Sequence, residues 1–115
     1  MDTKIDETCL ENMQSLLGEQ FNDTLEFCLS EFDRLANEVK ATIDDDLEAA
    51  TRNAHSLKSN AAQFGAMSLA DVARTIEMSL VENNVEHAKT QVSVLCSEVD
   101  ASKALLQRWL TSSVK

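Results

Sequence analysis

The chain has 115 residues, 43% of them hydrophobic and 26% charged, which is enough for one domain with a buried core and too little for two. Its 20 acidic residues against 10 basic ones give a net charge of −10, which disfavours binding to nucleic acid or to anionic membrane surfaces. Proline is absent and glycine occurs only twice, whereas β-rich and loop-rich proteins need more of both for their turns, so the composition favours helices.

Several features indicate an ordinary intracellular protein. The apolar runs are too short to span a bilayer, and the N-terminal residues lack the apolar core of a signal peptide, so we expect a cytoplasmic location. Cys9, Cys28 and Cys96 are odd in number and widely spaced, and no CxxC pair is present. We expect them to be reduced thiols that pack as small hydrophobes and not metal ligands.

Apolar residues recur at helical spacing in five segments of a single domain over residues 1–115. The pattern predicts helices over residues 5–17, 20–41, 45–64, 68–82 and 84–111. Four long amphipathic helices with short connections pack most simply as an antiparallel up-and-down bundle. The expected fold is therefore an all-α four-helix bundle, with the short first helix capping one end and a monomer as the default state.

Local signals predict where these helices begin and end. Capping-box pairs mark the starts of the last three helices: Asp45 with Glu48, Ser68 with Asp71, and Asn83 with Glu86. Gly18 is expected to stop the first helix. Gly65 is expected to end the third in a left-handed conformation.

His55 does not fit the apolar face of its helix. On a helical wheel it lies roughly 130° from the centre of the apolar stripe, so it is expected to face solvent. Its neighbours on the wheel are Thr51, Lys58, Ser59 and Ala62. Three of these are small, which leaves room for a partner protein, and the fourth is a cation one turn away.

This environment suits a particular chemistry. An exposed imidazole is largely neutral at pH 7, so one ring nitrogen is a free nucleophile. Lys58 can offset the charge of a phosphoryl group on the ring. From geometry alone the alternative stays open that His55 is an ordinary surface residue, as His87 is expected to be.

A longer pattern surrounds His55. Residues 54–59 (AHSLKS) are followed by Phe64-Gly65-Ala66, Leu69, Ala73 and Ile76-Glu77. This stretch closely resembles the signature of the histidine-containing phosphotransfer (HPt) domain family, with every spacing intact over residues 54–77.

The resemblance implies a role for individual residues. His55 corresponds to the phosphoacceptor, modified on Nε2, and Lys58 to the lysine that steadies the phosphoryl group. Ser59 stands where the family most often has glycine, and Gly65 corresponds to the glycine that ends the histidine's helix. Glu77 corresponds to the acidic or amide position that can orient the histidine.

The resemblance also implies the partners. The chain would carry a phosphoryl group between receiver-domain aspartates of response regulators and a hybrid sensor histidine kinase. Mg²⁺ would sit on the receiver, and no cofactor or metal on this chain. The partner would dock on Thr51, Arg52, Ser59 and Ala62. With no glycine-rich phosphate loop, the chain would be a carrier and not an enzyme.

Two other classes of function compete with this interpretation. A helical adaptor or inhibitor of a signalling kinase or regulator would keep the same helices and would not need the imidazole. A cofactor-binding bundle or enzyme would need ligands such as paired Glu-xx-His motifs, which the sequence lacks.

Overall fold

The computed structural model describes residues 3–113, and within them it contains five α-helices, one short 3-10 helix and no β-strand. The elements are α1 (Glu7–Leu17), η1 (Gly18–Gln20), α2 (Phe21–Thr42), α3 (Leu47–Gln63), α4 (Met67–Val81) and α5 (Val85–Ser113). Each α-helix begins and ends within two residues of the range expected from the sequence. None of these helices is long and apolar enough to cross a membrane.

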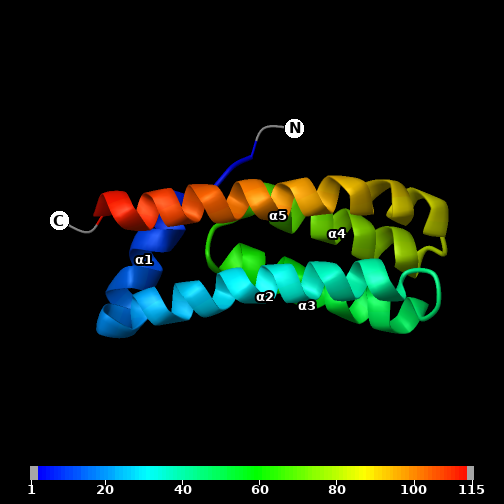
Figure 1. Cartoon of the computed structure of the whole chain (residues 1–115), viewed down its shortest axis with the longest axis horizontal. Coiled ribbons are helices and arrows are strands. Elements are labelled where there is room, and N and C mark those ends of the chain that lie inside the picture. Colours follow the sequence, from blue (N-terminus) through cyan, green and yellow to red (C-terminus); the bar gives the residue numbers. More distant parts are fainter. Residues whose placement is uncertain (1–2, 114–115) are drawn as a thin grey trace.

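Helices α2 to α5 form an antiparallel up-and-down bundle (Figure 1). Helices that follow each other in the chain pack side by side, and α5 returns to pack on α2, which closes the bundle. The molecule measures 47 × 25 × 18 Å, and α1 lies across the end where α2 begins and α5 ends. The expected all-α bundle is therefore confirmed.

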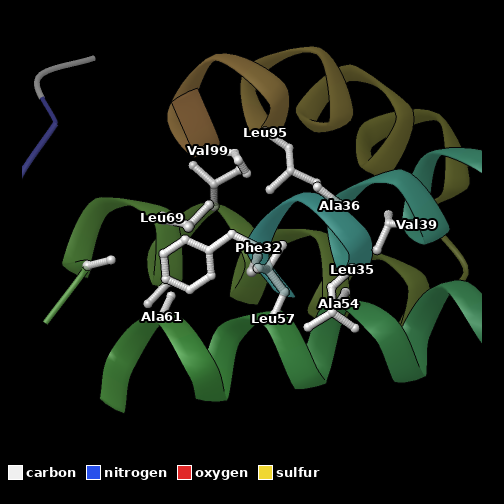
Figure 2. Close-up of a cluster of buried hydrophobic side chains, with 14 of the residues drawn as sticks. Phe32, Leu35, Ala36, Val39, Ala54, Leu57, Ala61, Leu69, Leu95 and Val99 are labelled. Atoms are coloured by element: carbon white, nitrogen blue, oxygen red, sulfur yellow. The ribbon is translucent and has the colours of Figure 1, made fainter. Parts of the chain in front are cut away.

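The core is filled from all four long helices, because each presents apolar residues at helical spacing to the bundle axis. Phe32 of α2, Leu57 of α3, Leu69 of α4 and Leu95 of α5 are fully buried within it (Figure 2). The inner face of α3 is unusual because most of its buried residues are alanines. Such small side chains let neighbouring helices approach closely, which packs the histidine-bearing helix firmly between α2 and α4.

Two of the expected helix caps lie one residue further along the chain. Asp46, and not Asp45, caps α3, where its carboxylate accepts from the backbone N–H three residues later at 3.1 Å. Asn84, and not Asn83, does the same for α5 at 3.3 Å. Asn83 instead adopts a left-handed conformation with φ 61°, a region that asparagine tolerates better than most residues. In both places the neighbouring residue carries an equally good capping group, so the sequence could not separate them.

The turn between α3 and α4 is held by the N-terminal segment. The Gly65 carbonyl accepts from the backbone N–H of Asp6 at 2.7 Å, and the Lys4 carbonyl accepts from that of Met67 at 3.1 Å. Ser68 does not cap α4 as expected, because its buried hydroxyl accepts from the Lys4 N–H at 2.9 Å. These bonds fix how α3 and α4 meet.

Gly65 is needed in this turn for two reasons. Its φ of +76° is the left-handed conformation expected at the end of α3. A Cβ at this position would also lie 2.6 Å from the backbone oxygen of Asp6, closer than any real contact allows.

Candidate functional site

His55 projects from the outer face of α3, opposite the alanine-lined inner face, and its side chain is 58% exposed. The helix places it there because the apolar residues of α3 are drawn into the core and the ring lies roughly 130° away from them. The imidazole is thus held on a rigid helix and remains open to an approaching molecule.

The carboxylate of Glu77, on α4, joins two residues of α3. Its Oε2 lies 2.6 Å from Nδ1 of His55, and its Oε1 accepts from Nζ of Lys58 at 2.7 Å. The Glu77 side chain is only 16% exposed, and that of Lys58 is 29% exposed. One carboxylate therefore positions both the ring and the ammonium group, and each of its oxygens has one partner.

These contacts determine the ionisation of Glu77. Partial burial raises the pKa of its carboxyl, but hydrogen bonds from Lys58 and His55, together with their charges, outweigh burial and leave the pKa below its ordinary value. Glu77 is therefore a carboxylate at neutral pH, with no proton of its own to donate.

An acceptor at Nδ1 selects the tautomer of the ring. Because the Glu77 carboxylate can only accept, the neutral His55 ring carries its proton on Nδ1, where it donates to Oε2. The lone pair is then on Nε2, the ring nitrogen away from the Glu77 contact. This is the tautomer that a nucleophilic Nε2 requires.

Most side chains next to the His55 ring project little from the helix surface. Arg52, Ser59 and Ala62 are exposed, and Thr51 is half-buried with its hydroxyl donating to the backbone of its own helix at 2.7 Å. Thr51, Ser59 and Ala62 have small side chains. Arg52 is the one bulky residue of the four, and it lies about one turn from His55 along α3. A flat protein surface could therefore reach His55.

The structure also exposes apolar side chains on the outer faces of α4 and α2 that sequence reasoning missed. Met78 and Val81 of α4 are 52% and 65% exposed and follow Glu77 at one and four residues. Phe27 of α2, 66% exposed, borders a small hollow of about 130 Å³ between α2 and α3. In the sequence these apolar residues stand out on otherwise polar helix faces, but only after the inner and outer faces of each helix have been assigned.

No group of three His, Cys, Asp or Glu side chains within the described residues gathers closely enough to hold a metal ion. His87 lies exposed in the first turn of α5, where it lines a groove of about 390 Å³ with residues of α4. Of the cysteines, Cys28 is buried, which raises the pKa of its thiol to about 12, and all three are free thiols.

Together the fold and this site define a small helical bundle that presents one oriented, exposed imidazole on the outside of a helix. Residues 7–108 match the family model of the Hpt domain. The chain belongs to the Hpt domain family, a family of phosphorelay proteins.

Solved structures show the same fold. Histidine-containing phosphotransfer protein B from Pseudomonas aeruginosa aligns with a TM-score of 0.86 at 19% identity, over 90% of this chain and 91% of that one. Histidine-containing phosphotransfer protein ZmHP2 from maize aligns with a TM-score of 0.80 at 19% identity, over 93% and 83%. At such identities the likeness establishes the fold alone. No curated protein sequence matches the chain.

Proposed function

We propose that this chain is a phosphoryl carrier that accepts a phosphoryl group on Nε2 of His55 from a receiver-domain aspartate and passes it to another. The observation that supports this most strongly is the bridge made by Glu77, which holds Nδ1 in its protonated form and leaves Nε2 as the nucleophile. An ordinary surface histidine has no need of such an arrangement.

In the proposed transfer, an N–P bond to His55 replaces the P–O bond to the aspartate. The Nε2 lone pair attacks the phosphorus of the phospho-aspartate, an N–P bond forms, and the P–O bond to the aspartate breaks with its electron pair staying on that carboxylate. The ring then carries a positive charge, which Glu77 stabilises through Nδ1–H. The reverse sequence discharges the phosphoryl group to the next aspartate.

Lys58 would take part in both the unmodified and the phosphorylated states. In the unmodified protein its ammonium group donates to Glu77, one helical turn from His55. A phosphoryl group on Nε2 would offer a second anion within reach of this flexible side chain. Lys58 would then offset part of the added negative charge.

The partner would supply the rest of the chemistry, as the family resemblance implies. Mg²⁺ and most of the groups that act on the phosphoryl oxygens would belong to the receiver domain, and this chain would supply a nucleophile on a low surface. Docking over Thr51, Arg52, Ser59 and Ala62 would bring the two sites together. Response regulators and a hybrid sensor histidine kinase in the cytoplasm are the expected partners.

The test is phosphate transfer from a labelled, phosphorylated receiver domain in the presence of Mg²⁺. We expect acid-labile, alkali-stable label on the wild-type chain and on His87→Gln, the matched control, and none on His55→Gln. Label on all three would contradict the assignment of His55. No label on any of them, across several receivers, would favour an adaptor that binds without accepting phosphate.

A further inference from the structure

The outer face of α4 has an unusual pattern. Five residues of this helix are exposed, and successive ones lie four, three, four and three positions apart in the chain. They are Met67, Asp71, Arg74, Met78 and Val81. This is the alternating spacing that keeps one seam of a helix facing a partner helix. The seam lies on the side of α4 away from the bundle core.

The seam is also unusual in composition. Met67, Met78 and Val81 are 42%, 52% and 65% exposed, and they make up half of the large exposed hydrophobic side chains of the described chain. The two polar members are one acid and one base, Asp71 and Arg74, with side chains 68% and 64% exposed. An apolar seam with a balanced pair of charges is typical of a helix that packs against another.

We propose that this seam, named here the α4 face and formed by the five residues above, binds a second copy of the chain in an antiparallel pairing of the two α4 helices. In such a pairing residues whose numbers sum to 145 lie opposite each other. Met67 of one copy then faces Met78 of the other, and Asp71 faces Arg74, on both sides of the two-fold axis. Val81 reaches the α3–α4 turn of the other copy.

The charges select this orientation. A parallel pairing in register would place Asp71 against Asp71 and Arg74 against Arg74, both of which are repulsive. The antiparallel pairing replaces both repulsions with two identical attractions. Within one copy the Asp71 and Arg74 side chains are 3.4 Å apart, a loose surface contact that leaves both groups available to a partner.

Net charge explains why a second copy would use this face. Two chains that each carry −10 repel one another over most of their surfaces. The five residues of the α4 face sum to zero, and the nearest further acid on the helix, Glu77, is already paired with Lys58. The open groove of about 390 Å³ that begins at Arg74 and Met78 gives the incoming methionine space to pack.

The dimer is expected to be weak. A single helix face buries less than the roughly 1,200 Å² of stable interfaces, so the association should be reversible and depend on concentration. It does not involve the His55 ring, and it is independent of phosphate transfer. His55→Gln should therefore dimerise as the wild type does, even if the proposed carrier function fails.

The first experiment is sedimentation of the full chain from about 10 µM to about 1 mM. We expect the average mass to rise from 12.7 kDa towards twice that value. Met78→Asp should weaken the association at least tenfold, and Leu16→Asp, which changes a more exposed residue on α1, should leave it unchanged. A constant monomer mass, or equal effects of the two variants, would overturn the proposal.

Charge reversal tests the pairing itself. Asp71→Arg and Arg74→Asp should each weaken the dimer several-fold, because each places like charges opposite one another. The double variant Asp71→Arg/Arg74→Asp should restore it, since the complementarity returns in reversed form. Failure of the double variant to recover would contradict the antiparallel arrangement.

A cross-linking experiment tests the register. A mixture of Met67→Cys and Met78→Cys should form a disulfide between the two positions under mild oxidation, mapped by mass spectrometry. Either variant alone should not, because its own two positions in the dimer lie about 16 Å apart along the helices. Equal cross-linking of the single variants would overturn the proposed register.

Discussion

Replacing Glu77 by glutamine tests the contacts of this carboxylate with His55 and Lys58, with almost no change in side-chain shape. One oxygen becomes an NH₂ donor, which can face either Lys58 or His55 but cannot accept from either. Facing Lys58, it loses that bond and leaves the ammonium group unpaired. Facing His55, it donates to Nδ1 and moves the ring proton to Nε2, the atom that attacks in the proposed transfer.

The magnitude follows from the two bonds, of 2.6 and 2.7 Å. Hydrogen bonds to charged groups contribute about 1.5–3 kcal/mol, and the 58% exposure of His55 places this one at or below the low end. A loss of about 1.4 kcal/mol from the reacting tautomer slows transfer about tenfold.

We therefore expect Glu77→Gln to accept phosphate from a receiver about tenfold more slowly in rapid-quench experiments. Glu82→Gln, which changes an exposed carboxylate at the end of the same helix, is the control and should match the wild type. Nitrogen NMR should show a proton on Nδ1 in the wild type and a mixture of tautomers in Glu77→Gln. A wild-type transfer rate together with an unchanged tautomer would refute the reasoning.

The stability difference between the wild type and the same variant is expected to depend on pH. The folded pKa of Glu77 lies below its value in the unfolded chain, about 4.3, so folding favours the ionised group. This contribution is fully present above the unfolded pKa and is lost as the pH falls through the folded one. The stability difference between wild type and Glu77→Gln in urea should shrink below pH of about 4.3. A difference that grows on acidification would contradict the direction of the shift.

Three further predictions concern the turn and the surface near His55. Gly65→Ala should lower the unfolding free energy by about 2–4 kcal/mol, because of its left-handed backbone and the 2.6 Å contact. Gly18→Ala, with φ +56° in open space, should lower it by about 1 kcal/mol. Equal losses in chemical denaturation would contradict this. Ser59→Arg should block phosphate transfer by bulk without lowering the thermal midpoint, and normal transfer would remove Ser59 from the docking surface. Lys58→Ala should slow transfer or shorten the phosphohistidine lifetime, and unchanged kinetics would exclude a role for Lys58.

The helices could be predicted because burial imposes a period on the sequence. Apolar residues at helical spacing determined the five ranges to within two residues, and the same wheel placed His55 on the outer face. Caps are harder to predict because each depends on a single side chain. Asp45 and Asp46 offer the same carboxylate one position apart, and only the path of the chain decides between them.

Contacts between helices could not be derived from one helix at a time. The family resemblance singled out Glu77 and Lys58, but their bond joins residues on two helices, and only the packing of α3 on α4 creates it. Ser68 shows the same limit, because its hydroxyl binds the N-terminal segment that lies 64 residues away in sequence. The α4 face is likewise not evident from those residues of its helix that enter the core.

The most direct test of the account is the position of the phosphoryl group on the ring. Phosphorus and nitrogen NMR of the chain after transfer from a receiver distinguishes phosphate on Nε2 from phosphate on Nδ1. Because Glu77 holds Nδ1 with its proton, the account predicts the N–P bond at Nε2 of His55 and a retained proton on Nδ1. Phosphate on Nδ1, or on a residue other than His55, would contradict it.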